Sequence, residues 1–326
     1  MHRRNSVKFA ITTLLSLLVF SANAQDANSY PSKPIRIIVN FPPGGTVDVM
    51  TRGVAQKLTE KWGQPVVVDN RPGAGGNIGA QAVASAEPDG YTLLATPPGP
   101  MTINQYLYKD MRFDPAKLSS VIMMASVPNA IAARIDFPAN NVKELIAYTK
   151  ANPGKVSFGS QGNGSTSHLT GQMFATMVGS DMMHIPFKGE GPALTEILGG
   201  RVDLFLGNIS AVLKLYQNKQ IKLLGVASPK RSPMANEIPA SQEFGMPDFV
   251  ASAWFAIAAP PGTPATIVNK LNAAILEALK LPDTQQKMAA LGGEVVGGSP
   301  ADMTTMVIAE RARWKKVIET ANVKLD

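Results

Sequence analysis

Residues 35–68 read IRIIVNFPPGGTVDVMTRGVAQKLTEKWGQPVVV, and this stretch decides the fold class. The apolar, β-branched run at 35–41 ends in two prolines and two glycines, which predicts a strand followed by a tight loop. Apolar residues at helical spacing then fill 48–62, and Gly63 and Pro65 end that helix. A second strand follows at 66–68. The order strand, helix, strand is typical of a parallel α/β sheet with helices on its faces.

The same alternation continues outward from this stretch. A helix is expected at 76–86 and a strand at 91–95. Ligands of parallel sheets bind beyond the carboxyl ends of the strands, in the loops that lead into helices. Three loops are therefore candidate binding loops: 42–47, 70–76 and 96–104, the last of which begins at Thr96.

The middle of the chain repeats the pattern, and the end departs from it. Further strands are expected at 121–127, 130–135, 156–158, 184–187, 202–206 and 221–227, with helices at 142–150, 169–178, 192–198 and 209–217. One strand at 254–259 and three helices at 264–280, 283–291 and 300–321 complete the chain. A lone strand before helices belongs to a sheet begun earlier. We therefore expect two lobes, residues 25–124 plus 250–326 and residues 125–249, with the C-terminus packed on the first lobe.

The first residues predict export from the cytoplasm. A basic start is followed by a short apolar run at 9–20 and by Ala22-Asn23-Ala24, the layout of a signal peptide at 1–24 with cleavage after Ala24. The apolar run is shorter than the roughly twenty residues that span a bilayer. Arg3-Arg4 leaves the twin-arginine route open beside general secretion. We expect a periplasmic protein.

Composition excludes several classes of function. The chain has no cysteine, which excludes disulfides, thiolate nucleophiles and a lipoprotein anchor. Three of its 31 basic residues lie before the cleavage site, which leaves 28 against 24 acidic residues and a net charge of +4. No basic run is interleaved with aromatic residues, so nucleic acid is not an expected partner.

The loop at 159–168, GSQGNGSTSH, combines three glycines with four hydroxyl side chains before a helix. Glycine lets backbone N–H groups approach a ligand, and a helix N-terminus attracts anions. The loop fits a carboxylate or phosphate cradle and, equally well, a surface loop whose Ser or Thr caps the helix. In the loop at 42–48, Thr46 or Asp48 can likewise serve as a cap. Asp48 suits an anion site only if it faces away or binds an amine.

Enzyme signatures are missing from the sequence. It contains no Gly-x-Ser-x-Gly, no phosphate-loop lysine, and no third glycine after Gly73 and Gly75, where Ile78 stands. His168 and His184 have no metal-binding spacing, and a lone strand histidine such as His184 is usually structural. We expect no catalytic residue, no cofactor and no metal.

Seven segments, in this order, resemble the TctC-like receptors of tripartite tricarboxylate transporters, also called the Bug family. The resemblance covers nearly all of the chain after residue 24. The segments are 30–35 (YPSKPI), 41–48 (FPPGGTVD), 70–77 (NRPGAGGN), 88–94 (PDGYTLL), 162–169 (GNGSTSHL), 184–189 (HIPFKG) and 260–264 (PPGTP).

The resemblance implies a two-lobed, type II-like periplasmic binding protein that closes on a small carboxylate. It implies membrane transporter subunits as partners, and we expect a monomer. A subunit that presents its ligand to a membrane sensor is the alternative, and an α/β hydrolase is a weaker one. The ligand-binding candidates carried over are Gly44, Gly45, Thr46, Ser160, Gly164, Ser165, Thr166 and His168, with Asn208 as a further contact. Asp48 and Thr96, in the candidate loops, complete the set of expected ligand-binding residues.

Two positions depart from the family pattern. Many relatives have an acid where Gly207 stands, and its loss removes a partner for a ligand amine. Phe187 replaces the more usual tyrosine, which removes one hydroxyl. The resulting hypothesis is a ligand without an amino group, such as a di- or tricarboxylate or an aromatic acid. The pair Trp254-Phe255 is expected in the core rather than in a pocket wall.

Overall fold

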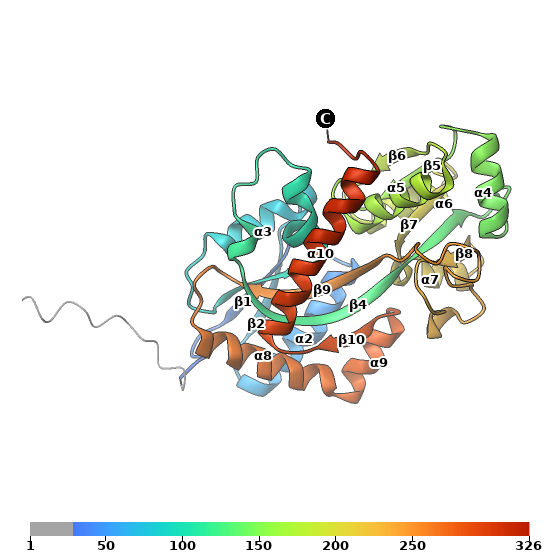
Figure 1. Ribbon diagram of the computed structural model, residues 1–326. Coiled ribbons are helices and arrows are strands. Elements are labelled where there is room, and N and C mark those ends of the chain that lie inside the picture. Colours follow the sequence, from blue (N-terminus) through green and yellow to red (C-terminus); the bar gives the residue numbers. More distant parts are fainter. Residues whose placement is uncertain (1–28, 326) are drawn as a thin grey trace, which may run out of the picture.

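Strand β4 (Ser119–Arg134) crosses the molecule and belongs to two sheets (Figure 1). The computed structural model describes residues 29–325, so the predicted signal peptide at 1–24 lies outside the described residues. The first part of β4 pairs with β9 (Ser252–Ala259) and β10 (Glu294–Gly297), and its second part pairs with β7 and β8. The sheets share this strand, and each forms the centre of one lobe.

The expectation of two separate strands at 121–127 and 130–135 is wrong. Pro128 interrupts the apolar sequence pattern, but the strand continues through it. Pro128 pairs with Ser252 at the point where β4 passes from one sheet to the other. From Asn129 onward β4 pairs with the second sheet. The Asn129 N–H donates to the Ala251 carbonyl at 2.9 Å, so the two chain crossings lie against each other. The residue limits set above for the lobes stay a prediction.

The first sheet has the predicted parallel strands at its edge. Its order is β2-β1-β3-β9-β4, with β2, β1 and β3 parallel and β9 antiparallel to both neighbours. Apolar side chains alternate to both faces, so helices cover both. The further elements are β1 (Ile35–Val39), α2 (Thr46–Trp62), β2 (Val66–Asn70), α3 (Asn77–Ala84), β3 (Thr92–Thr96), α8 (Ala265–Lys280) and α9 (Pro282–Ala290).

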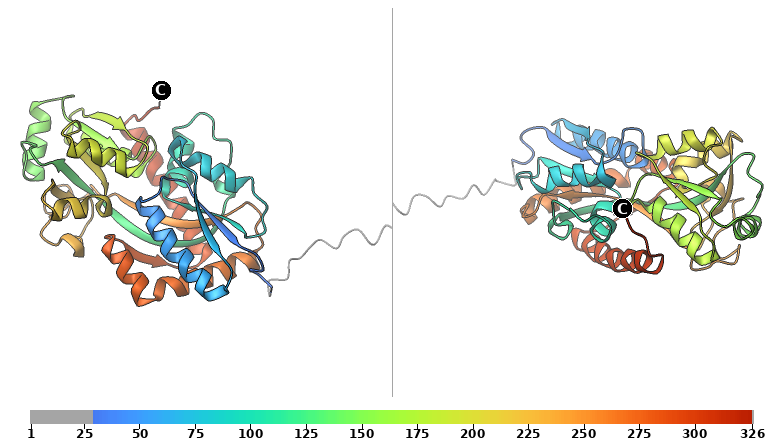
Figure 2. Two further views of the ribbon diagram at one scale, coloured as in Figure 1. Left: turned by 180° about the vertical axis from the view of Figure 1, so that it is seen from behind. Right: turned by 90° about the horizontal axis from the view of Figure 1, so that it is seen from above.

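The second sheet continues from β4 through β7, β5 and β6, with β8 also paired to β4. Figure 2 shows the two lobes side by side when the molecule is viewed from above. Strands β7, β5 and β6 are parallel to one another. The elements are α4 (Val142–Ala151), β5 (Ser157–Ser160), α5 (Thr166–Val178), β6 (Met183–Pro186), α6 (Glu190–Leu198), β7 (Leu204–Asn208), α7 (Ile209–Gln217) and β8 (Ile221–Val226).

The C-terminal helix α10 (Pro300–Thr320) packs on both lobes, not on the first alone as expected (Figure 1). Met303 belongs to an apolar cluster of the first lobe, whereas Trp314 and Ile318 pack in the cluster around Phe158 of the second. Strand β10 was not predicted, since its four residues lie between glycines. Among residues 29–325, no helix has both the length and the apolar character that a bilayer crossing requires.

Candidate functional site

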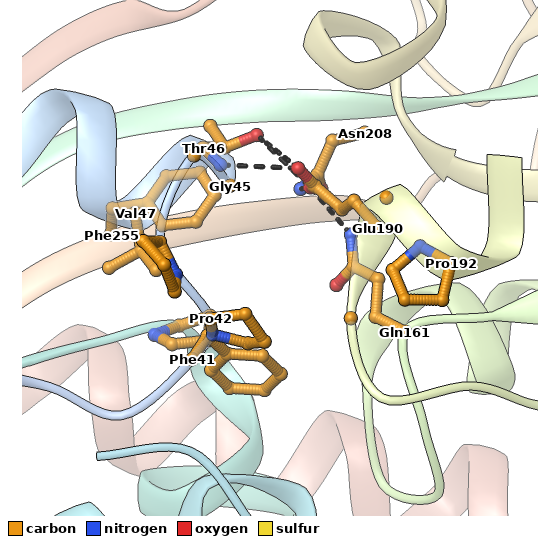
Figure 3. Close-up of a pocket in the computed structure, with 15 residues that line it drawn as sticks. Phe41, Pro42, Gly45, Thr46, Val47, Gln161, Glu190, Pro192, Asn208 and Phe255 are labelled. Carbon is orange, nitrogen blue, oxygen red and sulfur yellow. Dashed lines mark hydrogen bonds between the residues drawn. The ribbon is translucent and has the colours of Figure 1, made fainter. Parts of the chain in front are cut away.

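A cavity of about 180 Å³ lies where the N-termini of α2, α6 and α7 converge (Figure 3). Helix α2 belongs to the first lobe, and α6 and α7 belong to the second, so both lobes form its walls. Helix N-termini present free N–H groups and a partial positive charge. The lining residues are Phe41, Pro42, Pro43, Gly44, Gly45, Thr46, Val47, Pro97, Gln161, Gly189, Glu190, Gly191, Pro192, Asn208 and Phe255.

The loop after β1 presents the start of α2 to this cavity. Gly44 has a φ of 81°, a left-handed conformation that glycine adopts without strain. Gly45 is the N-cap and makes no side-chain cap hydrogen bond, which leaves the N–H of Thr46 free for another acceptor. Asp48 faces away from the cavity and accepts from the N–H of Gly44 and from Arg52. Burial opposes its charge, but these hydrogen bonds, together with one from Asn70, lower its pKa.

Four donors of the cavity converge on the carboxylate of Glu190, a residue that the sequence analysis missed. The Thr46 N–H donates to Oε2 at 3.1 Å, and the Thr46 hydroxyl donates to Oε1 at 3.0 Å. The side-chain amides of Gln161 and Asn208 donate to Oε1 at 2.7 and 2.6 Å. Thr46 lies on the first lobe and the other three residues on the second, so this cluster joins the lobes (Figure 3). We call these four donors the anion cradle.

All four donors of the anion cradle are neutral groups, so no cation among them balances a negative charge on Glu190. Burial raises the pKa of Glu190, and the hydrogen bonds from Asn208 and Thr46 act against that rise. Within the described part of the chain, no group of three His, Asp or Glu residues is placed to hold a metal ion. The chemistry of the anion cradle is therefore the solvation of a carboxylate by amide and hydroxyl donors.

Apart from Gln161, which donates to Glu190, the serines and the histidine of the loop at 159–168 bond to one another and to their neighbours, not to groups of the cavity. The Ser160 hydroxyl lies 2.7 Å from Nε2 of His184, and the Gly164 N–H donates to Nδ1 of His168 at 3.3 Å. Ser165 is the N-cap of α5 and accepts from the His168 N–H. The two histidine rings stack with their centroids 3.9 Å apart. We call Ser160, Gly164, Ser165, His168 and His184 the serine–histidine cluster.

Burial lowers the pKa of His168 to about 3, with a smaller contribution from His184, and lowers the pKa of His184 to about 4. Both imidazoles are therefore neutral at pH 7. Two residues of the serine–histidine cluster, His168 and His184, border a hollow of about 480 Å³ beside the C-terminus, which is distinct from the cavity of the anion cradle.

Four of the eleven candidate residues line the cavity: Gly44, Gly45, Thr46 and Asn208. Thr96 is fully buried, and its hydroxyl accepts from Asn40 and donates to the Pro97 carbonyl. Thr166 is buried at the first position of α5. Ligand contacts by all eleven candidates stay a prediction.

Packing explains the glycine at 207. A Cβ at this position would lie 2.4 Å from the ring of the buried Phe205 and 3.1 Å from Cβ of Ser167. An acid at 207 would therefore require the core to shift. The site nevertheless contains an acid, because Glu190 reaches Asn208 from another element. Phe187 borders an adjoining cavity of about 440 Å³.

The sequence offered only weak signals for the missed residues. Glu190 follows the segment 184–189 by one position and looks like an ordinary acid in the first turn of a helix. Gln161 lies inside the recognised glycine-rich loop but was not singled out. Phe255 is 2% exposed and lines the cavity, so it belongs to both the core and the pocket wall.

The chain is similar to known proteins over most of its length. Residues 50–323 match the family described as the tripartite tricarboxylate transporter family receptor. The chain is 37% identical over 323 residues to protein BugT of Bordetella pertussis, covering 97% of this chain and 99% of that protein.

Solved structures are similar over most of the chain. A protein of R. palustris, Rpa4515 with adipate, is 38% identical at a TM-score of 0.88, covering 91% of this chain and 100% of its own. MatC from Rhodopseudomonas palustris with bound malate is 30% identical at a TM-score of 0.84, covering 89% and 100%. Periplasmic binding proteins are among the similar structures. The chain therefore belongs to the tripartite tricarboxylate transporter family of receptors and has the two-lobed fold of periplasmic binding proteins.

Proposed function

We propose that this protein is a periplasmic solute receptor, not an enzyme, that binds a small carboxylate between its lobes. It then delivers the ligand to the membrane subunits of a tripartite tricarboxylate-type transporter. One observation carries the proposal: the anion cradle brings together donors from both lobes and already solvates one carboxylate, that of Glu190. A ligand carboxylate in the same place would tie the lobes together, and closure would follow from its better binding to the closed form.

The ligand class follows from the walls of the cavity. Phe41, Phe255 and three prolines (Pro42, Pro97 and Pro192) line the cavity beside its polar end, which suits an aliphatic or aromatic acid. The similar structures named above carry adipate and malate, both dicarboxylates. We propose a di- or tricarboxylate or an aromatic acid without an amino group.

The two lobes, proposed as residues 25–124 plus 250–326 and residues 125–249, would move about the paired crossings at Asn129 and Ala251. Besides these crossings, the lobes share an apolar cluster that includes Val47 of α2 and Ile209 of α7, and helix α10 packs on both lobes. In hinge closure a few residues absorb the change in backbone angles, and two adjacent crossings are suitably placed for that role.

Thermal unfolding of the protein after residue 24, with a panel of small carboxylates and the matching amides, tests the proposal. A ligand at a hundred times its Kd adds about 2.7 kcal/mol to the free energy of unfolding. This corresponds to a rise of several degrees in Tm. We expect a rise with at least one carboxylate and none with its amide. Stronger binding of aspartate than of succinate would contradict the absence of an amino group.

A further inference from the structure

We propose that Glu190 is a built-in competitor for the ligand: its carboxylate fills the anion cradle and has to leave before a ligand carboxylate binds there. This inference rests on the proposed function, since it concerns the same donors. It makes Glu190 a residue that sets the affinity of the site from within the chain.

The hydrogen bonds of Glu190 leave little room for a second role. A carboxylate has about four lone-pair sites. Oε1 accepts from Gln161 and Asn208, Oε2 accepts from the Thr46 N–H, and the one proton of the Thr46 hydroxyl is shared between Oε1 at 3.0 Å and Oε2 at 3.2 Å. These acceptor sites are therefore filled by protein donors. Glu190 is placed to occupy the anion cradle, not to recognise an amine or a hydroxyl of a ligand.

The anion cradle accommodates one carboxylate at a time. Its four donors are neutral and all point at Glu190, so no cation offsets a second negative charge. Two carboxylates that share one site repel each other strongly. Binding of a ligand carboxylate and occupancy by Glu190 are thus mutually exclusive.

The surrounding chain provides a place for a displaced Glu190. Its side chain lies between the cavity and a second hollow of about 200 Å³, which Val49, Leu194 and Ser210 help to line. Glycines flank it on both sides, and a Cβ at Gly191 would meet no other atom within 4 Å. Gly189 has a φ of 115°, a conformation that L side chains rarely adopt. The side chain can therefore swing into this hollow without a shift of the core.

Glu190 also acts as a latch between the lobes. Its hydrogen bonds to Thr46 cross from α6 to α2, and the Thr46 hydroxyl lies 2.8 Å from that of Ser210 on α7. A group tethered to the chain has an effective concentration on the order of millimolar or above. If Glu190 fills the anion cradle in about nine-tenths of the molecules, the apparent Kd of a ligand is about tenfold higher than its intrinsic Kd.

The test compares the wild type with Glu190→Ala, Glu190→Gln and a control, Glu196→Gln, which removes an acid from the same helix outside the cavity. Calorimetric titration with succinate, adipate, malate, citrate and benzoate at pH 7 gives the Kd values. Small-angle scattering without any carboxylate gives the radius of gyration. Circular dichroism verifies that each variant is folded.

We expect Glu190→Ala to bind at least one of these acids about tenfold more tightly than the wild type, with Glu190→Gln in the same direction and Glu196→Gln unchanged. The radius of gyration should rise in Glu190→Ala only. Equal or weaker binding by both Glu190 variants would overturn the inference. If no protein binds any acid, the proposed function fails, and the scattering then decides: an unchanged radius also refutes the latch, and a larger one supports it.

Discussion

The loop at 42–47 and the loop at 159–168 both place glycines and hydroxyl groups before a helix, but the structure uses their donors differently. In the first loop, the free N–H and the hydroxyl of Thr46 point across the lobes into the cavity. In the second, the Gln161 amide reaches the cavity, but Ser165 caps its own helix and His168 accepts from a neighbouring N–H. Similar composition therefore produces an open cradle in one place and a closed cluster in the other. The difference depends on the N-cap: Gly45 has no side chain to cap α2, whereas the Ser165 side chain caps α5.

The largest expected effect concerns acid stability and the serine–histidine cluster. Both histidines have lowered pKa values, about 3 and about 4, against 6.5 in the unfolded chain. Between pH 6.5 and about 4 the unfolded chain binds more protons than the folded one. The free energy of unfolding therefore falls with falling pH, by about 1.4 kcal/mol per pH unit for each histidine.

Urea unfolding at pH 7.0, 5.5 and 4.5 measures this loss. The variant His184→Phe keeps a ring against Phe158 and His168 but removes one titrating group. We expect its stability to fall less steeply than that of the wild type over this range. Equal slopes would show that the imidazoles are not buried as neutral groups.

A smaller effect is expected from truncation of the same cluster. His168 is 2% exposed, and His168→Ala removes a buried ring, which costs about 3 kcal/mol of stability. The matched control is Gln172→Ala on the same helix α5, for which we expect a change within about 0.5 kcal/mol. Denaturant unfolding at pH 7 measures both. A loss below 1 kcal/mol for His168→Ala would contradict a packed cluster.

A change of charge in the anion cradle is expected to alter ligand affinity. Asn208→Asp is nearly isosteric and places a second carboxylate beside Glu190. Like charges in one site cost several kcal/mol, so we expect an affinity loss of about a hundredfold for a carboxylate ligand. Asn140→Asp, exposed on the second lobe, adds the same charge and should change affinity by less than about twofold. Titration calorimetry distinguishes the two, and equal affinities would place the ligand elsewhere.

The smallest effect is expected at the cap of α5. Ser165→Ala removes the hydroxyl that accepts from the His168 N–H, which costs about 1 kcal/mol. Carboxylate affinity should stay within about twofold, because Ser165 does not line the cavity. A large loss of affinity with unchanged stability would mean that this loop holds the ligand after all.

The sequence predicted the α/β fold and most elements, because the strands from β1 to β3 are short apolar runs bounded by glycine and proline. The prediction failed at β4. Proline has no N–H to donate to a neighbouring strand, so Pro128 was interpreted as a strand end, whereas in the structure it lies within β4 opposite Ser252. The prediction also failed for α10, because contacts of a helix with two lobes depend on tertiary packing, which the residue pattern does not encode.

The candidate site was predictable in part. Thr46 lies in the loop after β1, which was recognised as a candidate binding loop, and Asn208 at the end of β7 was proposed together with the family resemblance. Glu190 was not recognised, because a single acid in a helix turn carries no sign of the four donors that converge on it. The internal bonding of Ser160, Ser165 and His168 was equally hidden, since it depends on how β5, β6 and α5 pack.

The central claim is that the ligand's carboxylate binds in the anion cradle at the start of α2 and not at the serine–histidine cluster. Backbone amide chemical shifts of ¹⁵N-labelled protein, followed during titration with the carboxylate that raises Tm and with its amide, test this most directly. The account predicts that the largest shift specific to the carboxylate occurs at the Thr46 N–H, the one backbone donor of the anion cradle. Carboxylate-specific shifts confined to Gly164, Ser165 and His168, with Thr46 unchanged, would contradict it.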